Sequence, residues 1–76
     1  MNNDRRKRID ATISSIQELR SELESIRDEE QEAFDNLPEG LQQGEKGQAM
    51  EDAISRLDVA ISACDDIESA AEDAKA

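Results

Sequence analysis

The chain has 76 residues and a mass of 8.4 kDa, which limits it to a single small domain. It contains nine basic and 20 acidic side chains, and its net charge of −11 disfavours direct binding to nucleic-acid phosphates or to anionic membranes. Histidine, tryptophan and tyrosine are absent, so the side chain most often used for acid–base catalysis and for metal binding is missing.

Apolar residues recur at helical spacing between Ile9 and Leu37. When Ile9 is taken as heptad position a, positions a, d and e form an apolar stripe about 100° wide, which is broad enough to contact more than one neighbouring helix. Residues 5–35 contain no glycine or proline, and Asp4 is a suitable N-cap. The pattern therefore predicts one long helix over about residues 4–36.

The only proline and all three glycines of the chain interrupt this pattern. Pro38 disfavours helical geometry at the preceding residue and lacks a backbone N–H, so the first helix should end near Asn36. Gly44 can cap a following helix, and Glu45 is favourable in the first turn of that helix. We expect a turn over residues 37–44.

Helical periodicity resumes over about residues 45–75, with smaller side chains than in the first helix. Position a now holds Met50, Leu57, Cys64 and Ala71, and alanine is the commonest residue at position d and beside it. Small side chains let helix axes approach closely, so a bulky first helix and an alanine-rich second helix form a complementary pair.

Two long helices joined by a short connection predict an all-α fold, an antiparallel two-helix hairpin that forms one domain over residues 1–76. This orientation places the basic segment Arg5–Arg8 beside the acidic end of the second helix. The acidic residues at that end are Asp65, Asp66, Glu68, Glu72 and Asp73. Ion pairing with these acids is one interpretation of Arg5–Arg8; binding of an anion is the other.

Two helices cannot cover apolar stripes of this width, so we expect the hairpin to associate. A coiled-coil-like four-helix bundle made by a homodimer is the simplest closed arrangement, and a bundle with another protein or a higher oligomer is the alternative. The pattern leaves open whether two hairpins dock in parallel or antiparallel orientation. The residues predicted to form the oligomer interface are Ile9, Ile13, Ile16, Leu19, Leu23, Ile26, Phe34, Ile54, Leu57, Ile61, Cys64 and Ile67.

Motifs for catalysis, metal binding or cofactor binding are not found. Inward-facing Glu-x-x-His pairs and the calcium-loop pattern are missing, and no base is placed to activate a serine. We therefore predict a protein that is not an enzyme and uses no metal or cofactor. Cys64 is interpreted as a small buried side chain in a cytoplasmic protein, with an intermolecular disulfide as the alternative. Apolar runs of membrane-spanning length are missing, and Arg5–Arg8 lead into Ile9–Thr12, which does not resemble the core of a secretory signal.

A second acidic group lies near the predicted turn and contains no basic residue. The candidate docking residues in it are Asp28, Glu29, Glu32, Asp35 and Glu39, and Glu30 lies among them at a seam position. A solvated helix surface explains such a group, and a negatively charged docking surface for a basic protein explains it as well.

The segment from Phe34 to Gly47, with the turn Asn36-Leu37-Pro38-Glu39-Gly40-Leu41 and an alanine-rich acidic helix after it, resembles small acidic helical-hairpin proteins of bacteria and their phages. Most members of that group have no assigned function, so the resemblance implies a small phage or mobile-element product and no particular chemistry. The function predicted from the sequence is a non-enzymatic interaction protein that modulates a basic, nucleic-acid-handling partner. A small-ligand or nucleotide sponge and a purely structural bundle subunit are the alternatives.

Overall fold

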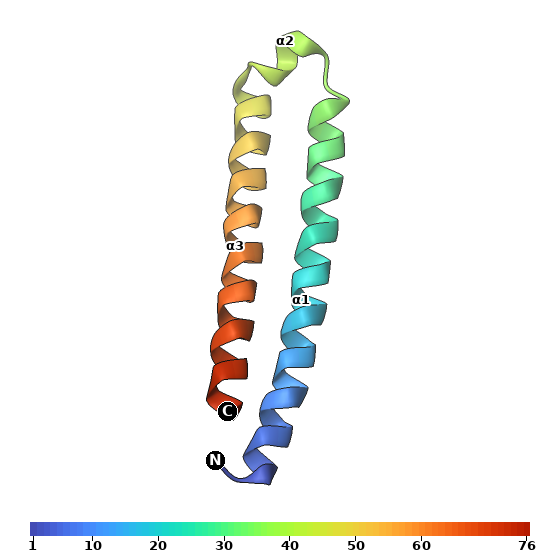
Figure 1. The fold of residues 1–76 in the computed structure, drawn as a ribbon. Helices are drawn as coiled ribbons and strands as arrows, with labels where there is room; N and C mark the ends of the chain where they lie inside the picture. The colour runs from blue at the N-terminus through green and yellow to red at the C-terminus, as the bar shows by residue number, and fades with distance from the viewer.

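A computed structural model describes residues 1–76 and contains three helices and no strand, which confirms the all-helical prediction. Helix α1 comprises Asn3–Asp35, the short helix α2 comprises Glu39–Gln42, and helix α3 comprises Glu45–Lys75 (Figure 1). None of the three is long and apolar enough to cross a membrane.

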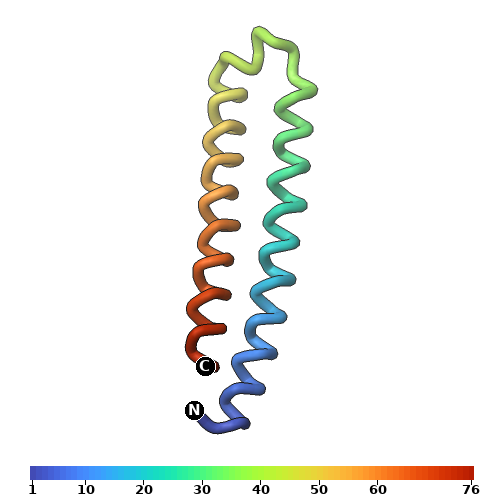
Figure 2. The backbone as a smooth tube through the Cα atoms, in the orientation of Figure 1, coloured from blue at the N-terminus to red at the C-terminus, as the bar shows by residue number.

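The two long helices lie side by side in antiparallel orientation, and α2 connects them at one end of the molecule (Figure 1). The resulting rod measures 58 × 15 × 12 Å between Cα atoms, so it is one helix thick. Both chain termini lie at the end opposite α2, where the first residues of α1 extend beyond the last residue of α3 (Figure 2).

Local hydrogen bonds explain where α1 begins and ends. Its N-cap is Asn2 rather than the expected Asp4, because the Asn2 side-chain oxygen accepts a hydrogen bond of 2.8 Å from the backbone N–H of Arg5. At the other end, the N–H of Leu37 still bonds the carbonyl of Phe34 at 3.0 Å. Pro38 follows and cannot donate, so the last helical residue is Asp35, three positions before it.

Helix α2 packs against the start of α3 at a point where only glycine fits. A Cβ atom on Gly47 would lie 2.0 Å from the backbone oxygen of Gln42, whereas a Cβ on Gly40 would meet no atom within 4 Å. The Gln42 side chain also donates hydrogen bonds to the carbonyls of Phe34, at 3.1 Å, and Leu37, at 3.2 Å. These contacts join the end of α1 to α2 and hold the turn against α3.

The core of this thin molecule is small. Only Ile13, Ile61 and Cys64 are buried among the hydrophobic side chains. Along α1 the side chains that contact α3 occupy positions a and e, so that position d points out of the layer. Helix contact therefore uses part of each apolar stripe and leaves the remainder at the surface.

Candidate functional site

On one face of the two-helix layer, polar side chains of α1 form hydrogen bonds with polar side chains of α3. We call this the polar face. These bonds join position b of one helix to position e of the other. They are Arg20–Asp65 at 2.7 Å, Arg27–Asp58 at 2.8 Å, Gln17–Glu68 at 2.7 Å and Lys75–Asp10 at 2.5 Å. From one bond to the next, the residue number rises along α1 by the same amount as it falls along α3. The bonds therefore set a single antiparallel register between the two helices.

The bases of the polar face are held in their charged form. A hydrogen bond to Asp65 raises the pKa of Arg20, although partial desolvation acts in the opposite direction. The pKa of Lys75 is raised mainly by its hydrogen bond to Asp10 and then by the bond to Glu72. The three bases are half-buried, but their partners Asp65, Asp58 and Asp10 are more than half exposed. Each pair therefore adds little to stability on its own, and the main effect of the pairs is to fix which sides of the helices meet.

The opposite side of the layer is apolar and carries no bonds between the helices. Position d of both helices points to this side, where Leu19, Ile26 and Ile67 keep 56%, 42% and 54% of their surface in water. Ala53 and Ala60 lie half-buried in the same row of α3. We call this surface, formed by positions a, d and g of both helices, the apolar face.

Charge is distributed unevenly between the two faces. Every acidic residue of α3 occupies position b, c or e, and none occupies a, d or g. On the apolar side α3 presents alanine and larger apolar residues, interrupted only by Lys46 and Arg56. Helix α1 contributes Glu22, Glu29 and Glu30 there, with Arg5 and Arg8 nearer its beginning. The apolar face is thus close to neutral in a chain with a net charge of −11.

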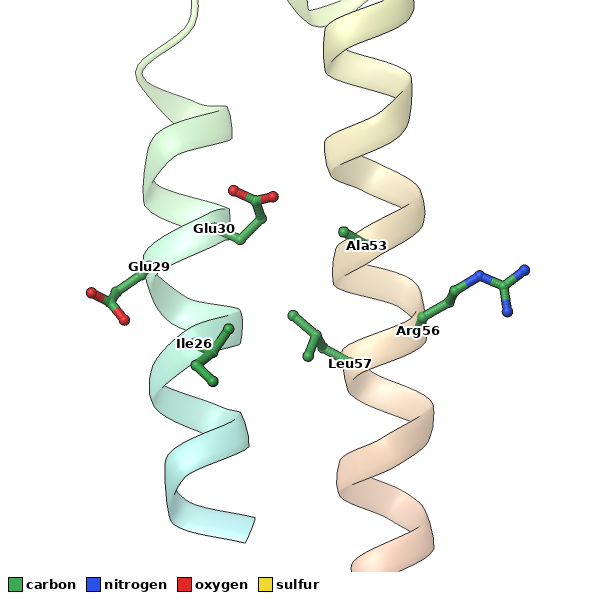
Figure 3. A pocket seen from close by; sticks show the side chains of 6 residues that line it. All are labelled: Ile26, Glu29, Glu30, Ala53, Arg56 and Leu57. Atoms are coloured by element: carbon green, nitrogen blue, oxygen red, sulfur yellow. The ribbon is translucent and has the colours of Figure 1, made fainter. Parts of the chain in front are cut away.

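A groove of about 670 Å³ runs between the helices on the apolar face. Glu30 of α1 and Leu57 of α3 point toward the space between the helices in Figure 3, and Ile26 and Ala53 also line the groove. Glu29 and Arg56 also line the groove, but their side chains point outward in opposite directions, away from each other (Figure 3). No ion pair within the chain involves either Glu29 or Arg56.

The predicted acidic docking residues gather on the outer side of α1 and in α2. This acidic cluster comprises Asp28, Glu29, Glu32, Asp35 and Glu39, and all five are exposed. Asp28 pairs with Arg27 and Asp35 accepts a hydrogen bond from Gln31, but the other three make no side-chain bond. Their negative charge therefore remains available to a partner from solution.

The basic segment Arg5–Arg8 does not make the ion pairs expected from the sequence. The polar register matches Asp10 with Lys75, so residues before Asp10 extend past the end of α3 and the predicted acids pair elsewhere or stay free. Arg6 instead donates to the backbone oxygen of Lys75 at 3.0 Å. Arg5 and Arg8 line a shallow groove of about 280 Å³ together with Met1, Ile9 and Thr12.

The structure shows no cluster of metal-binding side chains. No group of three or more carboxylate or thiol side chains is placed to hold a metal ion. Cys64, the only thiol, is buried between the helices, as expected for a small core side chain.

The residues predicted for an oligomer interface divide into three groups in the structure. Ile13, Ile61 and Cys64 are buried within the single chain. A second set is half-buried between the helices: Ile9, Ile16, Leu23, Phe34, Ile54 and Leu57. Leu19, Ile26 and Ile67 are the members left exposed. Sequence reasoning overlooked Arg56, although the absence of acids from positions a, d and g of α3 marks the same surface.

Comparison with known proteins identified no relative: no family model, curated protein or solved structure matches this chain.

Proposed function

We propose that this protein is a non-enzymatic interaction protein that acts as a homodimer. In this proposal the chain is a helical hairpin whose apolar face packs on the apolar face of a second copy, so that four helices enclose one core. The main support is the contrast between the two sides of the layer. One side satisfies its polar groups by bonds within the chain, and the other leaves Leu19, Ile26 and Ile67 in water.

Energy and size both favour association through this face. Complete burial of a Leu or Ile side chain contributes about 1.5–3 kcal/mol, and these side chains are only half covered in the single chain. A layer 58 Å long and 15 Å wide can supply the roughly 800 Å² per partner that specific interfaces bury. A nearly neutral face also lets two copies of an acidic chain meet without strong repulsion.

The oligomeric state in solution tests this step. Sedimentation equilibrium over a wide range of protein concentration should give twice the monomer mass of 8.4 kDa, with dissociation only on strong dilution. A mass of one chain at every concentration would overturn the proposal.

The second step of the proposal is that the dimer binds a basic protein through the acidic cluster. A four-helix bundle would display two such clusters on its outside, because Asp28, Glu32, Asp35 and Glu39 lie away from the apolar face and only Glu29 borders it. Attraction between the clusters and a basic surface should weaken as salt is added, since exposed charges are screened over about 8–10 Å at physiological ionic strength. This step predicts a salt-sensitive complex.

A matched pair of variants tests the acidic cluster without disturbing dimerisation. One variant carries Glu32→Gln, Asp35→Asn and Glu39→Gln, and the control carries the same loss of charge through Glu51→Gln, Asp66→Asn and Asp73→Asn on the outside of α3. Captured basic proteins from a host lysate, eluted by a salt step, should be lost with the first variant and kept with the second. Equal capture by both variants would refute a role for the cluster.

Anion binding is a second candidate function, favoured by the groove that contains Arg5 and Arg8. Neither arginine makes an ion pair within the chain, so both can bind a phosphate group. A nucleotide panel should then raise the melting temperature of the wild-type protein but not of an Arg5→Gln/Arg8→Gln variant. A flat response of the wild type would remove this candidate.

A further inference from the structure

We propose that two copies dock with their α2 turns at the same end of the bundle, and that Glu29 of each copy pairs with Arg56 of the other. This inference rests on the dimer proposed above and specifies its geometry, which the apolar pattern alone leaves open. In this geometry a second copy of the chain covers the groove on the apolar face.

The first step concerns the levels of residues along the rod. Arg27 and Asp58 are bonded across the layer at 2.8 Å and therefore lie at the same level. Glu29 lies two residues after Arg27, and Arg56 lies two residues before Asp58 on a helix that runs the opposite way. Glu29 and Arg56 consequently share a level, which agrees with their place on the rim of one groove (Figure 3).

The second step concerns the sides of the helices. Glu29 and Arg56 both occupy position g, and within one chain they point outward from opposite edges of the layer (Figure 3). They cannot reach each other across two helix widths, and no other side chain neutralises them in the chain. Two exposed groups of opposite charge thus border the apolar face at one level and lack partners.

The third step follows from symmetry. Two identical layers can form a closed bundle about a two-fold axis parallel to the helices, which places the turns at the same end and stacks α1 of one copy on α3 of the other. Levels are preserved by this axis, so Glu29 of each copy lies beside Arg56 of its partner. Leu19 then packs beside the partner's Ile67, because the Gln17–Glu68 bond places these two residues within one position of the same level.

The alternative axis, perpendicular to the helices, gives a poorer match of charge. It places the turns at opposite ends and stacks α1 on the partner's α1. With the rods fully overlapped, Glu22 near the middle of α1 would approach the partner's Glu22, and Arg56 would face alanine near Ala70. Like charges would meet and the opposite charges would stay unpaired, so electrostatics select the first arrangement.

Disulfide trapping separates the two arrangements. In a Cys64→Ala background, Glu29→Cys and Arg56→Cys variants are purified separately, unfolded together, refolded and oxidised. We expect a covalent dimer from the mixture and none from either variant alone. Covalent dimer formation by a Glu22→Cys variant alone, with none from the mixture, would overturn the same-end arrangement and leave the homodimer intact. A chain that sediments as a monomer overturns both proposals.

Charge exchange gives a second readout that needs no cysteine. Glu29→Arg or Arg56→Glu alone replaces two attractive contacts per dimer by repulsive ones and should weaken dimerisation about tenfold. The double variant Glu29→Arg/Arg56→Glu should restore the wild-type dissociation constant, because the pairs re-form with reversed sign. Circular dichroism checks that each variant keeps its helices. Additive weakening in the double variant would refute the pairing.

Discussion

Replacing Leu19 and Ile67 by glutamine should separate the proposed dimer into monomers. These side chains are 56% and 54% exposed in the single chain. Because complete burial contributes about 1.5–3 kcal/mol, covering the exposed half of each contributes about 0.8–1.6 kcal/mol. A symmetric dimer holds four such side chains, so their loss removes about 3–6 kcal/mol of association free energy. This corresponds to an increase of about 10²–10⁴ in the dissociation constant.

Sedimentation equilibrium or dilution monitored by fluorescence anisotropy of a labelled chain measures this constant. Val59 provides the matched control, because it is 69% exposed but occupies position c of α3, on the outside of the layer. Val59→Gln should leave the dissociation constant unchanged. If Val59→Gln and the Leu19→Gln/Ile67→Gln variant dissociate alike, or if neither differs from the wild type, the assignment of the apolar face is refuted.

Three further predictions concern the fold of the single chain. Gly47→Ala should lower the free energy of unfolding by up to about 2 kcal/mol, because a backbone clash costing about 1–3 kcal/mol outweighs a helix-propensity gain of about 1 kcal/mol. Gly40→Ala should be neutral or stabilising, because a Cβ there meets no atom within 4 Å. Equal effects of the two variants in urea unfolding would contradict the packing of α2. Ile13→Ala should lower the free energy of unfolding by about 2–3 kcal/mol. This is the lower end for a buried Ile, because a one-layer core can partly collapse around the cavity. A loss under 1 kcal/mol would disagree with the burial of Ile13. Because the pKa of Lys75 is raised in the folded state, the stability that Lys75 contributes is fully present below the ordinary lysine pKa of 10.5 and is lost as pH rises through the higher folded value. The melting temperatures of the wild type and Lys75→Gln should therefore converge as the pH rises above 10.5. A difference that persists would count against the Asp10 contact.

The helices and the break between them could be predicted because their causes are local. An apolar repeat at helical spacing and the absence of glycine or proline over residues 5–35 favour helix wherever the segment lies, and Pro38 ends it through its own ring. The N-cap was wrong by two residues for a local reason too. Asn2 and Asp4 both carry a capping oxygen, and backbone geometry selected Asn2.

The division of the apolar stripe between core and surface could not be predicted from the repeat. Positions d and e flank position a equally well, so periodicity alone does not say which flank faces the neighbouring helix. In the structure, Arg20 and Arg27 at position e reach Asp65 and Asp58 of α3, and these bonds rotate α1 so that position d turns outward. The same register carries Arg5–Arg8 beyond α3 and cancels the ion pairs expected for them.

The sequence by itself therefore determined the helical elements, their break and the strongly acidic character of the chain, because each of these depends on residue type and spacing along one segment. Only the tertiary structure decided which side of the layer is polar and which is apolar, and that Glu29 and Arg56 share a level without touching. Those features depend on the rotation and register of two helices about each other, and contacts between residues far apart in the chain set both.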